Sequence, residues 1–509
     1  MAQPLEVLAP PSAKPAPRNR PERAQGNIIH LKTLANTAKA TRISPNVLKG
    51  SLWAAEFVII AISGLLLATL YVPSTDVWRN GHYIIALSSA ALMTVMIFEA
   101  CRLYSRNAIS SPLRSMPRIA LAWTASLALL VAAAFFLKIG PAYSRVWLVM
   151  WFTAGIFLLL ASRFVLAAFT RQWARQGRLN RRAIIFGGGQ PCDQFIAAIE
   201  NDQDSDIQIC GIFDERGDER APDAHPDYPK LGNLDDLVDF VRNARVDVVV
   251  LTLPLSAEDR LTQAMRKIGI LPVDVRLSAS STKLRFRPRT YSHIGNVPVI
   301  DLADKPITDW NLIAKWAFDK LVAALAIVAL SPIMIATAIA IRLESRGPIF
   351  FRQKRYGFNN ELIEVYKFRS MYTDRCDANA SRLVTKDDPR VTRVGRIIRK
   401  TSIDELPQLI NVLRGELSLV GPRPHALHAK AADTLYDDAV EGYSARHRVK
   451  PGITGWAQIN GWRGETDTEE KIRKRVEYDL YYIENWSLML DLYILARTPF
   501  ALFKTDNAY

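Results

Sequence analysis

Two adjacent carboxylates, Asp404 and Glu405, stand out because they lie in a strongly cationic stretch of the sequence. The nearby Pro407 suits the first turn of a helix, so we expect the pair at a helix N-terminus, where backbone amides favour anions. A carboxylate there can attack a phosphorus atom, and its neighbour can act as a base or help to hold Mg²⁺. A purely structural interpretation also fits, because Ser402 and Glu405 have the spacing of a capping box.

Cations that can bind phosphate accompany this pair along the chain. Lys367 and Arg369 share one face of a short alternating stretch, and arginines recur at every third position from Arg390 to Arg399. On a helix the latter form one basic face, which suits either anionic lipid or a substrate phosphate. Arg423 stands between two prolines that restrict its geometry, so it is either a preorganised phosphate ligand or part of a plain surface turn.

A glycine-punctuated loop, 450–461, carries the polar side chains of Gln458 and Asn460. Loops of this composition can contact a nucleotide base or a sugar, although their most frequent role is a turn. Gln458 is therefore a candidate contact for a nucleotide or a sugar.

Four apolar stretches precede this region, and each has the roughly 20 residues that a helix needs to cross a bilayer. They cover 52–72, 83–101, 119–137 and 146–169. Lysines and arginines gather before the first stretch, in the second loop and after the fourth, so the positive-inside rule places both ends of the bundle in the cytoplasm. The few charges inside, Glu56, Glu99 and Arg163, lie near segment ends or can face the bundle.

Strand and helix patterns alternate between residues 181 and 300, which indicates a parallel, Rossmann-like sheet. Gly187, Gly188 and Gly189 follow its first strand and could cradle a phosphate at a helix N-terminus. A third glycine in register is missing, so the pattern favours a tight turn over dinucleotide binding.

A fifth apolar stretch, 321–341, is long enough to cross the membrane again. Both of its flanks are basic, which favours the cytoplasmic side for both ends. Ser331 and Pro332 lie at its midpoint, where proline removes an amide donor and the serine hydroxyl can satisfy a freed carbonyl. We therefore predict a re-entrant helix-break-helix over 315–342; a kinked spanning helix is the alternative.

The chain has 509 residues and a formal net charge of +15, from 65 Lys plus Arg and 50 Asp plus Glu. A hydrophobic content of 49% excludes a disordered polyelectrolyte, and four cysteines without a C-x-x-C exclude a disulfide framework. The basic excess suits nucleic acid or an anionic membrane with phosphorylated ligands. We expect no nucleic-acid partner, because the cations cluster at predicted membrane borders and no nucleic-acid motif occurs.

The expected fold class is a multi-domain membrane protein of about three domains plus a tail. Its parts are a disordered basic cytosolic tail (1–50), a four-helix transmembrane bundle (51–170), a Rossmann-like α/β soluble domain (171–300) and a mainly α catalytic module (310–509) that contains the re-entrant helix.

Three motifs occur in order in the last third of the chain. They are Lys367-Phe-Arg-Ser-Met371, the run 401–424 that ends in Gly421-Pro-Arg-Pro424, and Lys450-Pro-Gly-Ile-Thr-Gly-Trp456. Over roughly Lys315 to Tyr509 the chain resembles the bacterial monotopic polyprenyl-phosphate glycosyl-1-phosphate transferases. The preceding layout resembles the large members of that family, of the undecaprenyl-phosphate glucose phosphotransferase type.

The resemblance implies that a sugar 1-phosphate moves from a UDP-sugar to undecaprenyl phosphate with release of UMP, which begins exopolysaccharide, capsule or O-antigen assembly. Asp404 matches the nucleophile that forms a covalent phosphosugar intermediate, Glu405 matches its partner, and Mg²⁺ is expected near Asp404. The resemblance also implies phosphate-site roles for Lys367, Arg399 and Arg423, and it matches Ser331-Pro332 to the break in the re-entrant helix. The expected location is the bacterial inner membrane, with both termini and the site cytoplasmic, and the expected assembly is a homodimer.

The sugar stays open: the closing residues 507–509 resemble the tail of glucose-type members, and galactose is the alternative. A membrane-tethered nucleotide-sugar dehydratase or epimerase would carry a second glycine fingerprint and a Tyr-x-x-x-Lys pair, and no tyrosine here has a lysine four residues later. A non-enzymatic membrane sensor that uses the Rossmann-like domain is a further alternative.

Overall fold

The computed structural model describes most of the chain outside its two ends. The described residues are 43–73, 81–105, 108–109, 111–202, 205–216, 228, 230–254, 256–279, 292–294, 297–372, 388–425, 430–431, 434–435, 442–462 and 468–503. Most of the predicted cytosolic tail and the closing residues 507–509 lie outside them.

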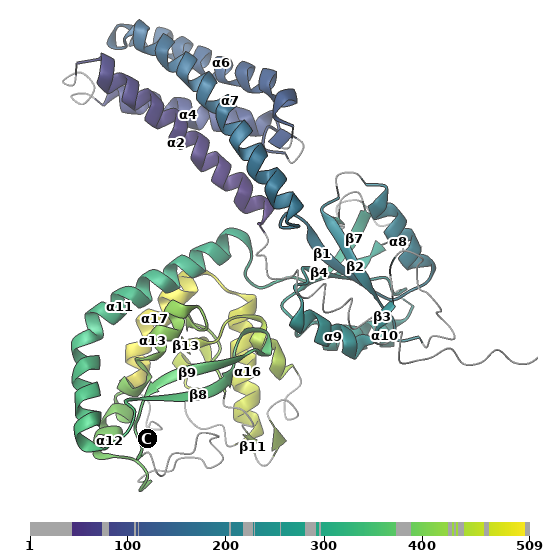
Figure 1. Ribbon diagram of the computed structural model, residues 1–509, viewed down its shortest axis with the longest axis vertical. Helices are drawn as coiled ribbons and strands as arrows, with labels where there is room; N and C mark the ends of the chain where they lie inside the picture. The colour runs from purple at the N-terminus through teal and green to yellow at the C-terminus, as the bar shows by residue number, and fades with distance from the viewer. Residues whose placement is uncertain are drawn as a thin grey trace, which may run out of the picture.

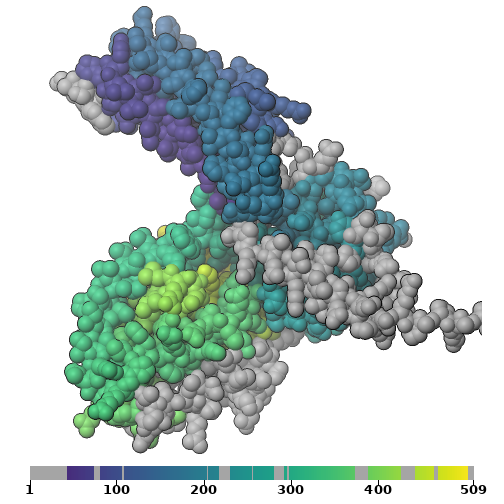
Figure 2. Space-filling view, viewed as in Figure 1, coloured from purple at the N-terminus to yellow at the C-terminus, as the bar shows by residue number. Residues whose placement is uncertain are grey.

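Four long helices form a lobe of their own, coloured purple to blue in Figures 1 and 2. They are α2 (Pro45–Tyr71), α4 (His82–Ala100), α6 (Pro112–Phe136) and α7 (Arg145–Arg175). Each is long and apolar enough to cross a membrane, as predicted. Trp123, Trp147 and Trp151 are fully buried between the helices, while many large apolar side chains face outward. An apolar exterior of this kind suits helices surrounded by lipid.

The charges inside the bundle pair with one another. Arg163 lies 2.7 Å from Glu56, and both side chains are buried. The Tyr104 hydroxyl donates to the second oxygen of Glu56 at 2.7 Å. Lys49 and Glu99 form a further ion pair at 2.6 Å. These charges therefore connect α2 to α7, α4 and the segment that follows α4.

A seven-stranded sheet with covering helices forms the second domain (Figure 1), and its strand order is β3-β2-β1-β4-β5-β7-β6. The strands are β1 (Arg181–Phe186), β2 (Ile207–Phe213), β3 (Lys230–Gly232), β4 (Val248–Leu251), β5 (Asp274–Ser278), β6 (Ser292–Ile294) and β7 (Val297–Ala303), and the helices are α8 (Gln190–Glu200), α9 (Leu234–Asn243) and α10 (Glu258–Ile268). The first five strands are parallel, but β7 pairs antiparallel with β5 and β6. The parallel, Rossmann-like arrangement predicted from the sequence is therefore confirmed for these five strands. The sheet as a whole is mixed, and β6 and β7 are too close in sequence for the crossover that parallel strands need.

The glycine loop between β1 and α8 forms a tight turn that is closed by an acidic side chain. Gly187 and Gly189 have positive φ angles of 105° and 89°. The Gly188 amide donates to Asp214 at the end of β2 over 2.8 Å, and Arg216 binds the same carboxylate at 2.5 Å. The middle amide of the loop is thus already occupied from within the domain.

The third part is built around the helix α11 (Asp309–Glu344), which Figure 1 shows as an arc along one side of the module. Inside the arc lie the ribbon of β8 (Phe350–Tyr356) and β9 (Leu362–Phe368), then α12 (Arg393–Lys400), the 3₁₀ turn η7 (Ile403–Glu405), α13 (Gln408–Arg414), β10 (Ser418–Val420), the 3₁₀ segment η8 (Tyr443–Arg448), β13 (Gly452–Thr454), α15 (Trp456–Ile459), α16 (Glu469–Glu484) and α17 (Leu488–Phe503). Its core includes the buried Leu409, Val412, Leu419, Tyr482 and Ile494.

Helical geometry continues through Ser331 and Pro332, so the structure has one bent helix of 36 residues where the sequence predicts a break. Pro332 has no amide to donate to the Val328 carbonyl, four residues before it, and the Ser331 hydroxyl donates to this carbonyl instead at 2.8 Å. At the other end of the helix, Glu344 accepts hydrogen bonds from the amides of Arg393 and Val394 at 2.6 and 3.0 Å. The end of α11 therefore caps the start of α12 within the catalytic module.

Candidate active site

The acidic pair lies in a short irregular segment between two helices. Ser402 adopts a left-handed conformation with φ of 58°, and η7 follows it directly. The Ser402 side chain makes no capping hydrogen bond there, so the capping-box interpretation is wrong. Helix α13 begins only at Gln408, after Pro407, so the pair precedes the helix instead of lying in its first turn. Gly415 caps the C-terminal end of the helix, as predicted, and its φ of 88° suits glycine.

Two cations from distant segments converge on Glu405. The ammonium of Lys367, in β9, lies 2.9 Å from Oε1 of Glu405. Arg423, after β10, donates to the same oxygen at 2.5 Å and to Oε2 at 3.3 Å. The structure thus brings together three of the site residues predicted from separate motifs.

The neighbouring Asp404 differs from Glu405 in its contacts. Within the described part of the chain, its carboxylate forms no hydrogen bond or ion pair closer than 4 Å. The positive charge of Arg399, in the last turn of α12, favours the ionised form of Asp404. Of the two carboxylates, Asp404 is therefore the one without a side-chain partner in the described part of the chain.

The two carboxylates ionise differently. Burial, only partly offset by Lys367 and reinforced by the charge of Glu405, raises the pKa of Asp404 to about 6. Burial also disfavours the ionised form of Glu405, but Arg423 and Lys367 outweigh it and hold its pKa well below the usual range. Near neutral pH both groups are ionised, and Asp404 is the more basic of the two.

The turn that carries Arg423 is held by backbone pairing and by a buried ion pair. Strands β10 and β13 are parallel, and the Gly452 amide donates to the Pro422 carbonyl at 3.0 Å. Arg446 donates to the carbonyl of Arg423 at 2.9 Å and forms an ion pair with Asp479 at 2.7 Å. The loop that sequence reasoning assigned to sugar binding or a turn therefore braces the Arg423 turn.

Sequence reasoning missed two arginines near the pair. Arg355, in β8, donates to the Pro424 carbonyl and to Gln353 at 2.8 Å. Its charge acts on Arg423 and Glu405, and burial together with the Arg423 charge lowers the pKa of Arg355 to about 10. In the sequence Arg355 is only one of several cations after the apolar stretch. The other is Arg446, whose contacts with Arg423 and Asp479 span 23 and 33 residues, so no local pattern reveals it.

Two other polar residues singled out in the sequence lie elsewhere. Arg369 is buried and donates to the carbonyls of Arg346 and Ser345 at 2.7 and 2.8 Å, so it ties the end of α11 to β9. Gln458 is buried in α15, and its Oε1 has no hydrogen-bond partner among the described residues. No hydrogen bond or ion pair within the described chain joins Gln458 to the acidic pair.

Apolar helices joined to a cationic site with one free carboxylate define a membrane-associated enzyme that handles a phosphorylated ligand. The description "Bacterial sugar transferase" matches residues 310–505, and "CoA-binding domain" matches 99–279. A Xanthomonas campestris pv. campestris protein named UDP-glucose:undecaprenyl-phosphate glucose-1-phosphate transferase is 32% identical over 487 residues, which cover 93% of this chain and 99% of that relative. The chain therefore belongs to the bacterial sugar transferase family.

Two further relatives differ in the sugar that their names state. The undecaprenyl-phosphate glucose phosphotransferase of Komagataeibacter xylinus is 39% identical over 360 residues, which are 70% of this chain and 66% of that protein. An Aeromonas hydrophila protein named UDP-N-acetylgalactosamine-undecaprenyl-phosphate N-acetylgalactosaminephosphotransferase is 44% identical over 185 residues, which are 36% of this chain and 42% of that protein. The similarity to the Aeromonas protein thus covers about a third of the chain.

Proposed function

We propose that this enzyme transfers glucose 1-phosphate from UDP-glucose to undecaprenyl phosphate and releases UMP, as the first step in assembling an exopolysaccharide, capsule or O-antigen. The observation that carries the proposal is the site itself: a free carboxylate, Asp404, beside cations that suit a diphosphate. Relatives named for the glucose reaction match most of the chain, which favours glucose over galactose. The N-acetylgalactosamine relative makes the sugar the part of the proposal that most needs a test.

In the proposed reaction, a carboxylate oxygen of Asp404 attacks the sugar-linked phosphorus of the UDP-sugar. The bond from that phosphorus to the oxygen bridging the two phosphates breaks, and UMP leaves with the electron pair. A phosphate oxygen of undecaprenyl phosphate then attacks the same phosphorus, and the bond to Asp404 breaks. The carboxylate is thereby regenerated, and the product carries the sugar on a diphosphate.

Glu405 acts in this scheme by positioning cations. Both of its oxygens are engaged by Lys367 and Arg423, and its low pKa makes it a weak base. The two cations thus lie ready beside Asp404, where negative charge develops on the transferring phosphate. Preorganised donors of this kind stabilise a transition state without having to reorient during the reaction.

Magnesium is a proposed cofactor, and the residues fit it. Within the described chain no group of three or more acidic, His or Cys residues could hold a metal ion. Mg²⁺ commonly binds through one or two carboxylates together with substrate phosphates, and the unengaged carboxylate of Asp404 can supply that contact. When bound, the ion would neutralise phosphate charge. Chelation with EDTA should abolish UMP release, and added Mg²⁺ should restore it.

The test uses purified full-length protein with undecaprenyl phosphate and a panel of UDP-sugars, scored for UMP. UDP-glucose should give the fastest release, and Asp404→Asn should abolish it while the protein still inserts in the membrane. Incubation with radiolabelled UDP-sugar and no lipid acceptor should leave label on the wild type but not on Asp404→Asn. Normal turnover by that variant would refute the nucleophile assignment.

We also propose that α11 re-enters the cytoplasmic face of the inner membrane. Its start contacts α2 near the exit of α7, at the end of the bundle that the positive-inside rule places in the cytoplasm, and its end caps α12 in the module that carries the site. Tags placed before Lys315 and after Tyr509 should both report cytoplasm, and a periplasmic C-terminus would overturn the proposal. The proposed homodimer can be tested by mass measurement of the purified protein in nanodiscs.

A further inference from the structure

A cavity of about 670 Å³ lies between the α/β domain and the catalytic module, away from the acidic pair. Its walls come from the end of α9, the loops before β4 and β5 and after β7, the first turns of α11, the end of α13 and the segment before β13. Most of the lining is apolar and includes Val273, Leu312, Trp316, Phe358 and Leu417. The volume lies in the range of sites that bind small molecules, and apolar walls suit a ligand with an apolar body.

The cavity lies at the level where the membrane helices begin. Asp309, the first residue of α11, accepts hydrogen bonds from Ser44 and, at 2.7 Å, from Asn46, which lie at the start of α2. Two turns further on, Leu312 and Trp316 line the cavity and remain 55% and 58% exposed. Exposed aromatic and aliphatic side chains at a membrane border are typical contacts for lipid. The cavity therefore adjoins the predicted surface of the bilayer.

Cations line the cavity in excess of carboxylates. Those that have acidic partners are Arg245 and Lys305, each 3.5 Å from Asp247, and Lys315, which lies 3.2 Å from Asp319 and 2.7 Å from Asp491. Three others, Lys320, Arg448 and Lys450, form no ion pair with any described carboxylate within 4 Å. The cavity thus carries positive charge that the described part of the protein does not neutralise locally.

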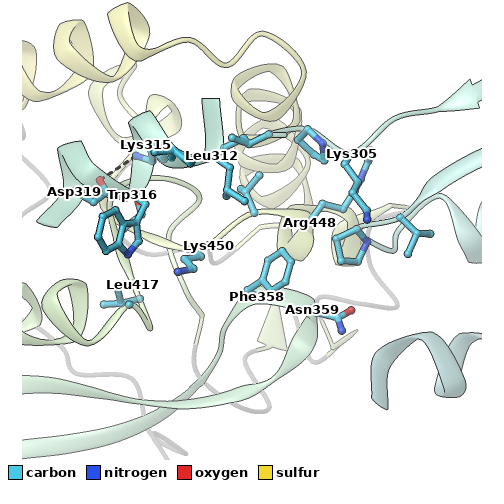
Figure 3. A pocket seen from close by; sticks show the side chains of 18 of the residues that line it. Lys305, Leu312, Lys315, Trp316, Asp319, Phe358, Asn359, Leu417, Arg448 and Lys450 are labelled. Atoms are coloured by element: carbon cyan, nitrogen blue, oxygen red, sulfur yellow. Dashed lines mark hydrogen bonds and ion pairs between the residues drawn. The ribbon is translucent and has the colours of Figure 1, made fainter. Parts of the chain in front are cut away.

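The unmatched cations point toward common space. A Cβ atom on Gly415 would lie 3.6 Å from the ammonium of Lys320 and 3.7 Å from that of Lys450, so two like charges flank one residue. Lys320 donates to the Val412 carbonyl at 3.1 Å and to the Leu413 carbonyl, whereas the Lys450 side chain makes no hydrogen bond within the described chain. Figure 3 shows Lys450 extending into the cavity between Trp316 and Phe358. Partial desolvation at the cavity wall and the charge of Lys320 lower the pKa of Lys450, although the residue as a whole remains exposed.

Arg448 lies further along the same wall (Figure 3). It donates to the Asp304 carbonyl at 2.6 Å, but its Nε is buried without a hydrogen-bond partner among the described residues. A buried donor of this kind costs free energy unless a ligand or water satisfies it. Arg448 is therefore a second point at which an anion would gain a hydrogen bond.

We propose that this cavity binds an anionic membrane phospholipid. Its phosphate lies between Lys320 and Lys450, with Arg448 available to a second polar group of the head, and its acyl chains pass Leu312 and Trp316 into the bilayer. The ligand combines the two properties that the walls require, an anion and a long apolar body. Such a lipid would fill the space between the α/β domain and the catalytic module at the membrane surface.

The test uses the full-length protein in nanodiscs that contain phosphatidylcholine with phosphatidylglycerol. After extraction into detergent, native mass spectrometry measures which lipid stays bound. The wild type should retain phosphatidylglycerol over phosphatidylcholine, and Lys450→Gln combined with Arg448→Gln should reduce that preference by roughly 100-fold, because two charge-assisted contacts, each worth about tenfold, are lost. The matched control is Arg352→Gln with Lys354→Gln, which removes two exposed charges from β8 and should leave the preference unchanged.

Lys450→Gln alone provides the test if the double variant fails to fold, because its side chain is exposed and makes no hydrogen bond within the described chain. Lys450→Arg keeps the charge and should retain the lipid. Equal lipid preference in the wild type and the Lys450→Gln variant would overturn the proposal. So would displacement of the lipid by millimolar glycerol phosphate or inorganic phosphate, which would identify a soluble anion as the ligand. The readout is lipid retention, so it does not depend on the proposed transferase reaction.

Discussion

Substitution of Arg355 can test whether the cations of the site, which outnumber the two carboxylates, bind the diphosphate of the substrate. The charges of Lys367, Arg399 and Arg423 act on the carboxylates of the pair, and the charge of Arg355 interacts with that of Glu405. Arg355 has only Gln353 and the Pro424 carbonyl as hydrogen-bond partners in the described chain. Its guanidinium charge is therefore available to a substrate phosphate.

We expect Arg355→Gln to lower kcat/KM for UDP-glucose by roughly 10- to 150-fold. A hydrogen bond to a charged group contributes about 1.5–3 kcal/mol, and each 1.4 kcal/mol is about tenfold in rate. The assay is the initial rate of UMP release with undecaprenyl phosphate as acceptor. Arg355→Lys keeps the charge but loses the planar fork, so it should recover only part of the rate.

The matched control is Arg352→Gln, on the same strand. The Arg352 side chain is 64% exposed and lies 5.3 Å from the Tyr366 ring, so its loss should change kcat/KM by less than about twofold. Binding of UDP-glucose to the Asp404→Asn background, with and without Arg355→Gln, separates phosphate affinity from chemistry. If Arg355→Gln lowers neither kcat/KM nor that affinity more than the control does, the surplus charge has no role in substrate binding.

Three further predictions concern ionisation and buried charge. Because Asp404 must be ionised to attack and has a pKa of about 6, kcat/KM for UMP release should fall as the pH drops below about 6. Arg423→Gln removes a cation that lowers this pKa, so the acid limb of the pH profile should move to higher pH. An acid limb that does not move would contradict the assignment of this pKa to Asp404. Asp479→Asn leaves the charge of Arg446, which is 1% exposed, without its partner and should destabilise the catalytic module by about 3–5 kcal/mol in denaturant unfolding; a loss under about 1 kcal/mol would count against a buried pair. Glu56→Gln should destabilise the membrane bundle by a similar amount in thermal unfolding of the detergent-solubilised protein, and an unchanged melting temperature would argue against the ion pair.

The membrane helices could be predicted closely because their signal is local. A run of about 20 apolar residues is sufficient to indicate a spanning helix, whatever the rest of the chain does. Their ends were less predictable: α6 begins at Pro112, and α7 continues to Arg175. Polar and charged residues extend these helices beyond the apolar run, so hydropathy alone misses their ends.

The acidic pair was predictable for a different reason. Asp404 and Glu405 are neighbours in sequence, and Lys367 and Arg423 lie in motifs that are conspicuous by their own composition. Arg355 was not predictable, because its contact with the Pro424 carbonyl joins residues 69 apart. Nothing near Arg355 in sequence distinguishes it from the cations around it.

The bend of α11 shows where a local rule gives only part of the answer. Proline at position 332 predicts a break, but helical geometry continues through it, and the Ser331 hydroxyl donates to the Val328 carbonyl, which the proline leaves without an amide partner. Whether a proline bends or breaks a helix depends on the partners of the freed carbonyls, and those depend on tertiary packing. The contact of Asp309 with Asn46, 263 residues away, is likewise beyond any local pattern.

Arg423 and the acidic pair lie on short elements that cannot hold their shape alone. Arg423 lies in a turn after a three-residue strand, and the acidic pair lies in a single 3₁₀ turn. The buried ion pair of Arg446 and Asp479 fixes the backbone of the Arg423 turn, because Arg446 also donates to the Arg423 carbonyl. Neither side chain of this ion pair bonds to the Asp404 carboxylate within the described part of the chain. Separating Arg446 from Asp479 would leave a buried charge without a partner, which costs free energy. The ion pair therefore holds the Arg423 turn in one conformation, where the neighbouring strand is too short to do so. The site therefore has two sets of charges: cations in excess of carboxylates, which can bind a substrate phosphate, and a buried ion pair of Arg446 and Asp479, which keeps the Arg423 turn rigid.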